Sequence, residues 1–275
     1  MPELPEVETV RRTLEMLASG KEIKQVSVFW PKMIKRPGEA EQFIDALIGQ
    51  HFREIGRRGK FLILYTDQYA LVSHLRMEGK YGLFDAADPV DKHTHVIFHF
   101  ADGTELRYKD VRKFGTMHLY EKGKEFETQP LADLGPEPFS DEFSVEWLSE
   151  KLKKTNRKIK PALLDQKILV GLGNIYVDEA LFRANIHPER IANTLSKDEE
   201  TILFREIVST LSEAVEKGGS TIRSYINTQG QIGMFQLQLN VYGRKNEPCK
   251  ICGTPLQKTV VGGRGTHFCP SCQKL

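Results

Sequence analysis

Four cysteines near the end of the chain constrain its fold more than any other feature. They form two Cys-x2-Cys pairs, Cys249 with Cys252 and Cys269 with Cys272, and sixteen residues separate the pairs. This spacing is typical of a tetrahedral zinc site, and four protein ligands leave the metal no open position for catalysis. We therefore predict one structural Zn2+ per chain, with a two-stranded ribbon between the knuckles. Two disulfides are the alternative, which a reducing compartment disfavours.

The predicted ribbon is basic although the whole chain is nearly neutral. The formal net charge is +2, yet residues 241–275 contain six lysines and arginines and a single acid. Lys258 and Arg264 flank the expected glycine-rich turn, where backbone can approach a phosphate closely. A second run, KLKKTNRKIK at 151–160, has six cations and no acid. Local basic surface of this kind suits nucleic acid, although a solvated charged face explains either run equally well.

Hydrophobic periodicity changes along the chain. Apolar residues at helical spacing predict a helix near residues 5–17. Alternating patterns predict strands from about 23 to 120, with a hairpin turn through Ala-Asp-Gly at 101–103. The segment QPLADLGPEPFSD at 129–141 has no periodic pattern, so we place a domain boundary there. The predicted strands are QVSVFW at 25–30, KFLILYT at 60–66, ALVSHLRM at 70–77, HVIFHF at 95–100 and TELRYKD at 104–110.

Helical periodicity dominates beyond the boundary. Ser196 and Glu199 form a capping box at the start of a long predicted helix that ends before two glycines, and its apolar face is expected to comprise Ile202, Ile207, Leu211 and Val215. Upstream, a glycine turn leads into a second helix at Asn174. Such an entry exposes N–H groups that can bind phosphate, and an ordinary corner between helices is the alternative.

The opening sequence MPELPEVETV places a proline directly after the initiator methionine. Removal of Met1 would leave Pro2 as a secondary α-amine, a group with a pKa of about 8. Attack of this amine on a sugar C1′ gives an iminium ion, which acidifies C2′–H and allows the 3′-phosphate to be eliminated. Glu3 can exchange a proton at the same centre, and a nucleophile beside an acid suits glycosidic-bond cleavage. Acids also favour helix N-termini, which accounts for Glu6 and Glu8 but not for Pro2.

Several motifs together resemble bacterial formamidopyrimidine-DNA glycosylase, the DNA-repair family that removes 8-oxoguanine and ring-opened purines. The similarity spans almost the entire chain in the same order. Besides the four cysteines, it includes PELPEVE at 2–8, RRGKFL at 57–62, HLRMEG at 74–79, DVRKFGTM at 110–117, GLGNIYVDE at 171–179 and GGSTIRSYINTQGQIGMFQ at 218–236.

The resemblance implies an α+β fold with separate domains. Residues 1–130 are expected to form a catalytic β-sandwich preceded by a helix, and residues 131–143 a linker. Residues 144–240 should form a helical, helix-two-turn-helix DNA-binding domain with a lesion loop, and residues 241–275 the zinc ribbon.

By the same resemblance, the chain is a glycosylase and AP lyase that acts as a monomer on double-stranded DNA containing oxidised purines. Pro2 would form the Schiff base, Glu3 would act as acid and base, Lys60 would assist β-elimination and Arg264 δ-elimination. The expected DNA contacts are His74, Met77, His93, Arg112, Phe114, Asn174, Tyr242 and Lys258. The residues expected around the extruded base are Glu78, Ser220, Thr221, Ile222, Arg223, Ser224 and Tyr225.

Three alternatives remain open at this point. An endonuclease VIII-type glycosylase for oxidised pyrimidines would share the architecture. A zinc-ribbon protein that binds DNA without chemistry would explain the basic ribbon but not Pro2 and Glu3, and a proline tautomerase would use neither the ribbon nor the helix entry. Because the chain has no long apolar run and no signal-peptide pattern, we expect a cytoplasmic bacterial protein, associated with the nucleoid through DNA.

Overall fold

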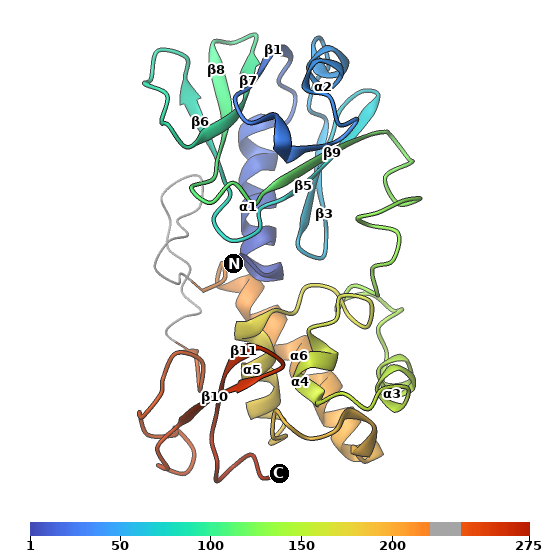
Figure 1. The fold of residues 1–275 in the computed structure, drawn as a ribbon, viewed down its shortest axis with the longest axis vertical. Helices are drawn as coiled ribbons and strands as arrows, with labels where there is room; N and C mark the ends of the chain where they lie inside the picture. Colours follow the sequence, from blue (N-terminus) through green and yellow to red (C-terminus); the bar gives the residue numbers. More distant parts are fainter. Residues whose placement is uncertain (221–237) are drawn as a thin grey trace. The chain divides into compact units, whose positions relative to one another are not determined.

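The computed structural model describes residues 1–220 and 238–275, which form two compact units (Figure 1). The first unit contains Met1–Asp133 and Ser220, and the second contains Leu134–Gly219 and residues 238–275. Within these residues, no helix has the length and apolar character needed to cross a membrane. The finer predicted division at residues 130, 143 and 240 stays a prediction.

The first unit opens with helix α1 (Leu4–Ala18), as the periodicity predicted. The backbone N–H of Glu3, just before the helix, donates a 2.8 Å hydrogen bond to the Glu6 carboxylate. Val10 and Leu14 are fully buried in the core of the unit. Core packing of this apolar face, rather than intrinsic propensity, is what stabilises such a helix.

Two sheets enclose that core, and their inward-facing residues belong to one hydrophobic cluster, as expected for a β-sandwich. The predicted turn at 101–103 joins β7 to β8. The strands of the four-stranded sheet are, in order, β1 (Ile23–Val28), β7 (Thr94–Phe100), β8 (Thr104–Lys109) and β6 (Lys80–Asp85). The strands of the five-stranded sheet are β2 (Ile34–Arg36), β9 (Thr116–Glu121), β5 (Tyr69–His74), β4 (Phe61–Tyr65) and β3 (Glu54–Arg58).

Two details of the strand region differ from the prediction. Strand β5 ends at His74 rather than at Met77, because Arg76 adopts a left-handed backbone conformation (φ 54°) that cannot continue a strand. A short helix, α2 (Ala40–Leu47), also follows the single turn η1 (Pro31–Met33) inside this region. Phe43 and Leu47 of α2 lie one helical turn apart and are fully buried.

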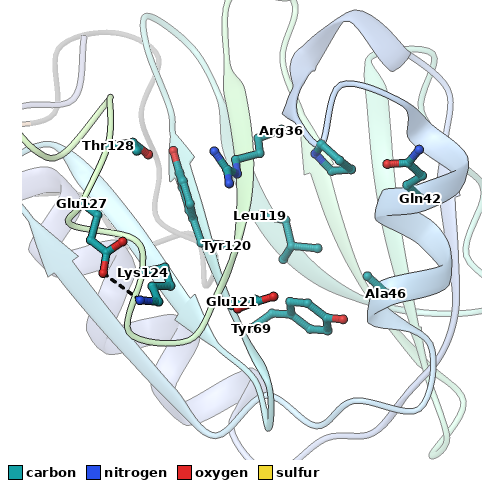
Figure 2. A pocket seen from close by; sticks show the side chains of 11 residues that line it. Arg36, Gln42, Ala46, Tyr69, Leu119, Tyr120, Glu121, Lys124, Glu127 and Thr128 are labelled. Carbon is teal, nitrogen blue, oxygen red and sulfur yellow. Dashed lines mark hydrogen bonds and ion pairs between the residues drawn. The ribbon is translucent and has the colours of Figure 1, made fainter.

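A pocket of about 450 Å³ lies between α2, strand β9 and the segment after β9 (Figure 2). Gln42 from α2 lines it, together with Leu119 and Tyr120 from β9. The Arg36 guanidinium lies 4.8 Å from the centre of the Tyr120 ring. None of the residues predicted to carry function lines this pocket, so it is separate from the candidate site.

The second unit is helical where the sequence predicted helices. Its longest helix begins with the predicted capping box. The backbone N–H of Ser196 donates to the Glu199 carboxylate at 2.8 Å, and the backbone N–H of Glu199 donates to the Ser196 hydroxyl oxygen at 3.2 Å. The buried face differs from the prediction, because it contains Leu203 and Ala214 whereas Ile202 is exposed. The helices are α3 (Val145–Lys153), α4 (Ile159–Leu163), α5 (Asn174–Arg183) and α6 (Lys197–Glu216), with a single turn η2 (Ala192–Thr194) before α6.

The predicted ribbon closes the second unit. Strands β10 (Gln257–Val261) and β11 (Arg264–Phe268) pair antiparallel, with Val261 opposite Arg264. Gly262 and Gly263 form the two-residue turn, and both have positive φ angles (56° and 74°) that other residues rarely adopt.

Candidate active site and nucleic-acid surface

The predicted nucleophile lies at the start of α1. Pro2 and Glu3 are both buried there. Besides the N–H of Glu3, the Glu6 carboxylate also accepts a 2.8 Å bond from the backbone N–H of Ser220. Glu6 therefore joins the predicted reagents to the first residue of the predicted lesion loop. Thr221 to Tyr225, the rest of the predicted lesion loop, lie outside the described residues.

A chain of polar contacts links α1 to the turn that carries Lys60. Arg57 on β3 donates to Glu8 (3.1 Å) and to the Gly59 carbonyl (3.0 Å), next to Lys60 in the turn between β3 and β4. Burial alone would raise the pKa of Glu8, but hydrogen bonds and charge from Arg11 and Arg57 lower it. The carboxylate therefore stays charged, which holds the Lys60 turn beside the helix.

Lys60 and His74 are brought together by strand pairing. Phe61, next to Lys60, lies opposite His74 in the sheet, with the two rings edge to face at 4.5 Å. Both Lys60 and His74 are buried, with 7% of each exposed. The backbone N–H of Arg76 donates to His74 Nδ1 at 2.9 Å, so Nδ1 is unprotonated and the neutral ring carries its proton on Nε2. Burial, with the charges of Arg76 and Lys60, lowers the pKa of His74 to about 3.

Two loops beside His74 expose apolar side chains to solvent. Met77, in the loop after β5, is 38% exposed, and Phe114, in the loop between β8 and β9, is 51% exposed. The Arg112 guanidinium lies 4.8 Å from the centre of the Phe114 ring. Glu78 is half-buried in the loop that carries Met77. His93 contributes its backbone to this region, because its carbonyl accepts the Asp110 N–H at 2.9 Å.

The structure adds a basic cluster that the sequence did not reveal. Lys35 and Arg36 on β2 and Arg76 after β5 surround His118, and the part of the chain that the structure describes gives none of these three cations an acidic partner. Burial, Lys35, Arg76 and Arg36 lower the pKa of His118 to about 4. The adjacent Lys35 and Arg36 were visible in sequence, but only strand pairing brings them to Arg76.

In the second unit, the four cysteines form a site suited to zinc. All four Sγ atoms lie within 4.8 Å of one another, and the four thiols are free. Two of the Sγ pairs are 3.5 and 3.9 Å apart. A tetrahedral zinc with Zn–S bonds of about 2.3 Å requires separations of about 3.8 Å. The chain therefore holds one structural zinc ion, and the disulfide alternative is wrong.

The tip of the ribbon is fixed to the helix entry at Asn174. The carbonyl of Gly265, next to Arg264, accepts hydrogen bonds from Asn174 Nδ2 (2.9 Å) and from Lys160 Nζ (3.1 Å). Arg264 itself is exposed beside the turn, as is Lys258 on β10. The structure thus fixes the predicted residue Asn174 to the backbone next to Arg264 and leaves the Arg264 and Lys258 side chains accessible.

Two adjacent carboxylates on α5 hold the ribbon and the segment before it. Asp178 pairs with Lys160 at 2.7 Å, both side chains being fully buried, and accepts the N–H of His267 at 2.9 Å. Glu179 accepts the backbone N–H groups of Asn240, Val241 and Tyr242 at 2.8 to 2.9 Å, as well as the Asn240 side-chain amide at 3.0 Å. The predicted contact residue Tyr242 is therefore positioned by Glu179, and its ring lies edge-on to His267 at 4.9 Å.

The basic run at 151–160 is largely ion-paired rather than free. Lys160 is buried against Asp178, while Lys154, Arg157 and Lys158 pair with acids nearby. These acids come from other parts of the sequence, or from one helical turn away, so the local charge count overstated the free positive charge. Neither Lys160 nor the two carboxylates of α5 were identified from sequence. The sequence signal that could have indicated the buried carboxylates is an Asp-Glu pair within an otherwise apolar helix.

Comparison with known proteins accounts for both units. Residues 1–117 match the formamidopyrimidine-DNA glycosylase N-terminal domain, residues 134–226 the formamidopyrimidine-DNA glycosylase H2TH domain, and residues 246–275 the zinc finger found in FPG and IleRS. The chain is 66% identical to the formamidopyrimidine-DNA glycosylase of Bacillus licheniformis over 100% of both chains.

Solved structures agree with this match. A Lactococcus lactis FPG variant in complex with DNA containing Fapy-dG has a TM-score of 0.95, 44% identity and 100% coverage of both chains. A complex of Lactococcus lactis Fpg with DNA containing an abasic site has a TM-score of 0.94 and 44% identity, covering 99% of this chain and 100% of that one.

A β-sandwich followed by a helical unit and a four-cysteine zinc ribbon defines a class of DNA glycosylases of base excision repair. The chain belongs to the formamidopyrimidine-DNA glycosylase family. It is accordingly a DNA-binding repair enzyme, and AP lyase activity is part of the function of this family. This membership removes the alternatives of a non-catalytic zinc ribbon and of a proline tautomerase.

We predict that the His74 ring stays neutral, with its proton on Nε2, from about pH 8 down to about pH 5. Its folded pKa of about 3 lies below the ordinary 6.5, so the unfolded chain binds a proton that the folded chain does not. The contribution of His74 to the free energy of unfolding is therefore at its maximum above pH 6.5 and decreases as the pH falls toward 3. Histidine 15N NMR during a pH titration measures this, with His74→Asn to assign the signal. A titration midpoint near 6.5 would contradict it.

We predict that Glu179→Gln loosens the ribbon attachment. An amide offers one acceptor oxygen where the carboxylate offers two, so buried N–H groups of residues 240–242 lose their partner at a cost of about 1–3 kcal/mol. Hydrogen exchange of these amides should accelerate, and the thermal midpoint should fall. Glu216→Gln, at an exposed position at the end of α6, is the matched control. Equal exchange rates in the two variants would show that Glu179 does not hold this segment.

Proposed function

We propose that the chain excises 8-oxoguanine and formamidopyrimidine bases from double-stranded DNA as a monomer in the bacterial cytoplasm, with Pro2 as nucleophile. The observation that carries the proposal is the burial of Pro2 and Glu3 at the start of α1, where Glu6 joins them to Ser220. Burial of this kind removes water from a reactive amine and strengthens its interaction with neighbouring charges. The Lactococcus lactis complexes, with DNA containing Fapy-dG or an abasic site, support the choice of substrate.

The proposed chemistry needs a free secondary amine, and therefore loss of Met1. The Pro2 nitrogen attacks C1′ while the glycosidic bond breaks, and the bond's electron pair leaves with the base, which takes up a proton. Glu3 exchanges protons at the opened sugar, where the C1′–O4′ bond breaks and the iminium ion forms. Loss of the C2′ proton then expels the 3′-phosphate, and a second elimination expels the 5′-phosphate. Lys60 and Arg264 are the proposed cations at these phosphates.

The proposed contacts with DNA come from side chains of both units. Met77, Arg112 and Phe114 would occupy the space that the extruded nucleotide leaves, because unstacking a base costs a few kcal/mol that apolar contact partly recovers. The proposed partners of the extruded base are Glu78 and the residues from Ser220 to Tyr225. The proposed phosphate and backbone contacts are His74, His93, Asn174, Tyr242 and Lys258.

We predict that Pro2→Gly loses about 100-fold or more of the lyase activity, the scale expected for a group that takes part in the reaction, while lesion binding is kept. A primary amine gives a neutral imine, which needs an added proton before it becomes an electron sink. Borohydride trapping on an 8-oxoguanine:cytosine duplex, followed by peptide mapping, measures the adduct. Pro31→Gly, at an exposed proline of the same unit, is the control. Trapping on a lysine, or full activity of a chain that retains Met1, would contradict the mechanism.

We predict that strand cleavage is faster on duplexes with 8-oxoguanine than on duplexes with thymine glycol. Parallel single-turnover assays at equal salt concentration measure the two rates, because phosphate contacts make binding steeply salt-dependent. A preference for thymine glycol would instead assign the endonuclease VIII type of specificity. That result would leave the role of Pro2 intact and overturn only the choice of substrate.

A further inference from the structure

Asp110, the residue after β8, is a buried carboxylate that is not one of the proposed reagents or DNA contacts. It is 1% exposed. A buried charge is tolerated only when hydrogen bonds or an opposite charge compensate it. Three backbone N–H groups do so: that of Arg112 donates to Oδ1 at 3.0 Å, and those of Phe114 and Gly115 donate to Oδ2 at 2.9 and 2.8 Å. The carboxylate therefore accepts three of the five backbone N–H groups between Val111 and Gly115.

Neighbouring contacts fix the same loop from its other sides. The Asp110 carbonyl bonds His95 Nε2 at 2.7 Å and accepts the N–H of Lys113 at 3.3 Å. Lys113 has a left-handed backbone (φ 58°), an unusual state for a residue with a side chain. Gly115 packs so closely on Tyr108 that a Cβ atom would lie 1.8 Å from the tyrosine oxygen. The loop conformation is thus specified by its own contacts within the first unit, without DNA.

The conformation keeps an aromatic ring in solvent. Phe114 is 51% exposed and carries the Arg112 guanidinium 4.8 Å from its ring centre. A flexible loop would fold such a ring back onto the protein, because burying apolar surface is favourable. The N–H groups of Arg112 and Phe114 are both held by Asp110, so the two side chains are presented together.

We infer that Asp110 is a positioning residue for base extrusion, whose carboxylate holds Arg112 and Phe114 in place before DNA binds. The inference rests on the proposed function, in which these two side chains fill the space left by the extruded nucleotide. Preorganisation lowers the ordering cost that would otherwise accompany binding. The benefit applies to the step that unstacks a base and is small for an abasic site, which has no base to unstack.

Asp110→Ala tests this assignment by comparing two substrates of the same enzyme. Single-turnover excision from an 8-oxoguanine:cytosine duplex should slow by about tenfold to a hundredfold, as expected when buried N–H groups lose their acceptor. Cleavage of a duplex that already contains an abasic site should stay within about threefold of wild type, because the lyase chemistry at Pro2 is untouched. An equal loss on both substrates, or no loss on either, would overturn the inference.

Further variants separate positioning from a general loss of structure. Asp110→Asn keeps one acceptor oxygen and should give an intermediate rate, with a smaller fall in the thermal midpoint than the alanine variant, which keeps the test valid if the alanine variant does not fold. Asp102 is the control, because it lies in the turn before β8 and its carboxylate accepts the Thr104 N–H at 3.0 Å. Asp102→Ala removes this acceptor and should leave both rates unchanged.

A double variant gives an independent measurement. Once Phe114→Ala has removed the ring, Asp110→Asn should slow excision little further, because both changes act on the same step. Fully additive losses would overturn the inference. If wild type itself fails to excise 8-oxoguanine, the proposed function fails instead, so the two failures are distinguishable.

Discussion

Two adjacent carboxylates on α5 must find partners in order to remain buried, and their partners organise the second unit. Removing one member of a buried ion pair costs about 3–5 kcal/mol, because the other charge is left uncompensated. Asp178 is compensated by Lys160 and by the N–H of His267, and Glu179 by the N–H groups of residues 240–242. Because Lys160 also donates to the Gly265 carbonyl, the same charges that satisfy the helix fix the ribbon beside Arg264.

The first unit uses buried or half-buried acids in the same way. Glu6 accepts N–H groups from Glu3 and Ser220, Glu8 holds Arg57 beside the turn of Lys60, and Asp110 shapes the loop of Phe114. Glu6 and Asp110 lie near the end of a helix or strand, where backbone N–H groups lack partners within the element, whereas Glu8 acts through the Arg57 side chain. These acids are not the proposed reagents. Their effect is to fix the backbone on which the proposed reagents lie, which is how a site gains precise geometry.

Sequence patterns predicted the elements that short-range chemistry specifies. The capping box at Ser196, the cysteine spacing and the turn at 101–103 each encode their own local geometry, and the structure confirms all three. Charge patterns were less reliable. The run at 151–160 looked like free positive surface, yet four of its cations are paired with acids. The cluster of Lys35, Arg36 and Arg76 escaped notice, because strand pairing joins residues that are far apart in the chain.

The sequence by itself determined the zinc ligands, the two-part organisation and, through its motifs, the family and the candidate reagents. It could do so because ligand spacing, hydrophobic periodicity and motif order are properties of neighbouring residues. Only the tertiary structure decided that His74 is a neutral donor through Nε2, that Asn174 and Lys160 share one carbonyl, and that Asp110 supports Phe114. Each of these features depends on which groups are buried next to one another in the folded chain. Burial is set by tertiary packing rather than by the order of residues.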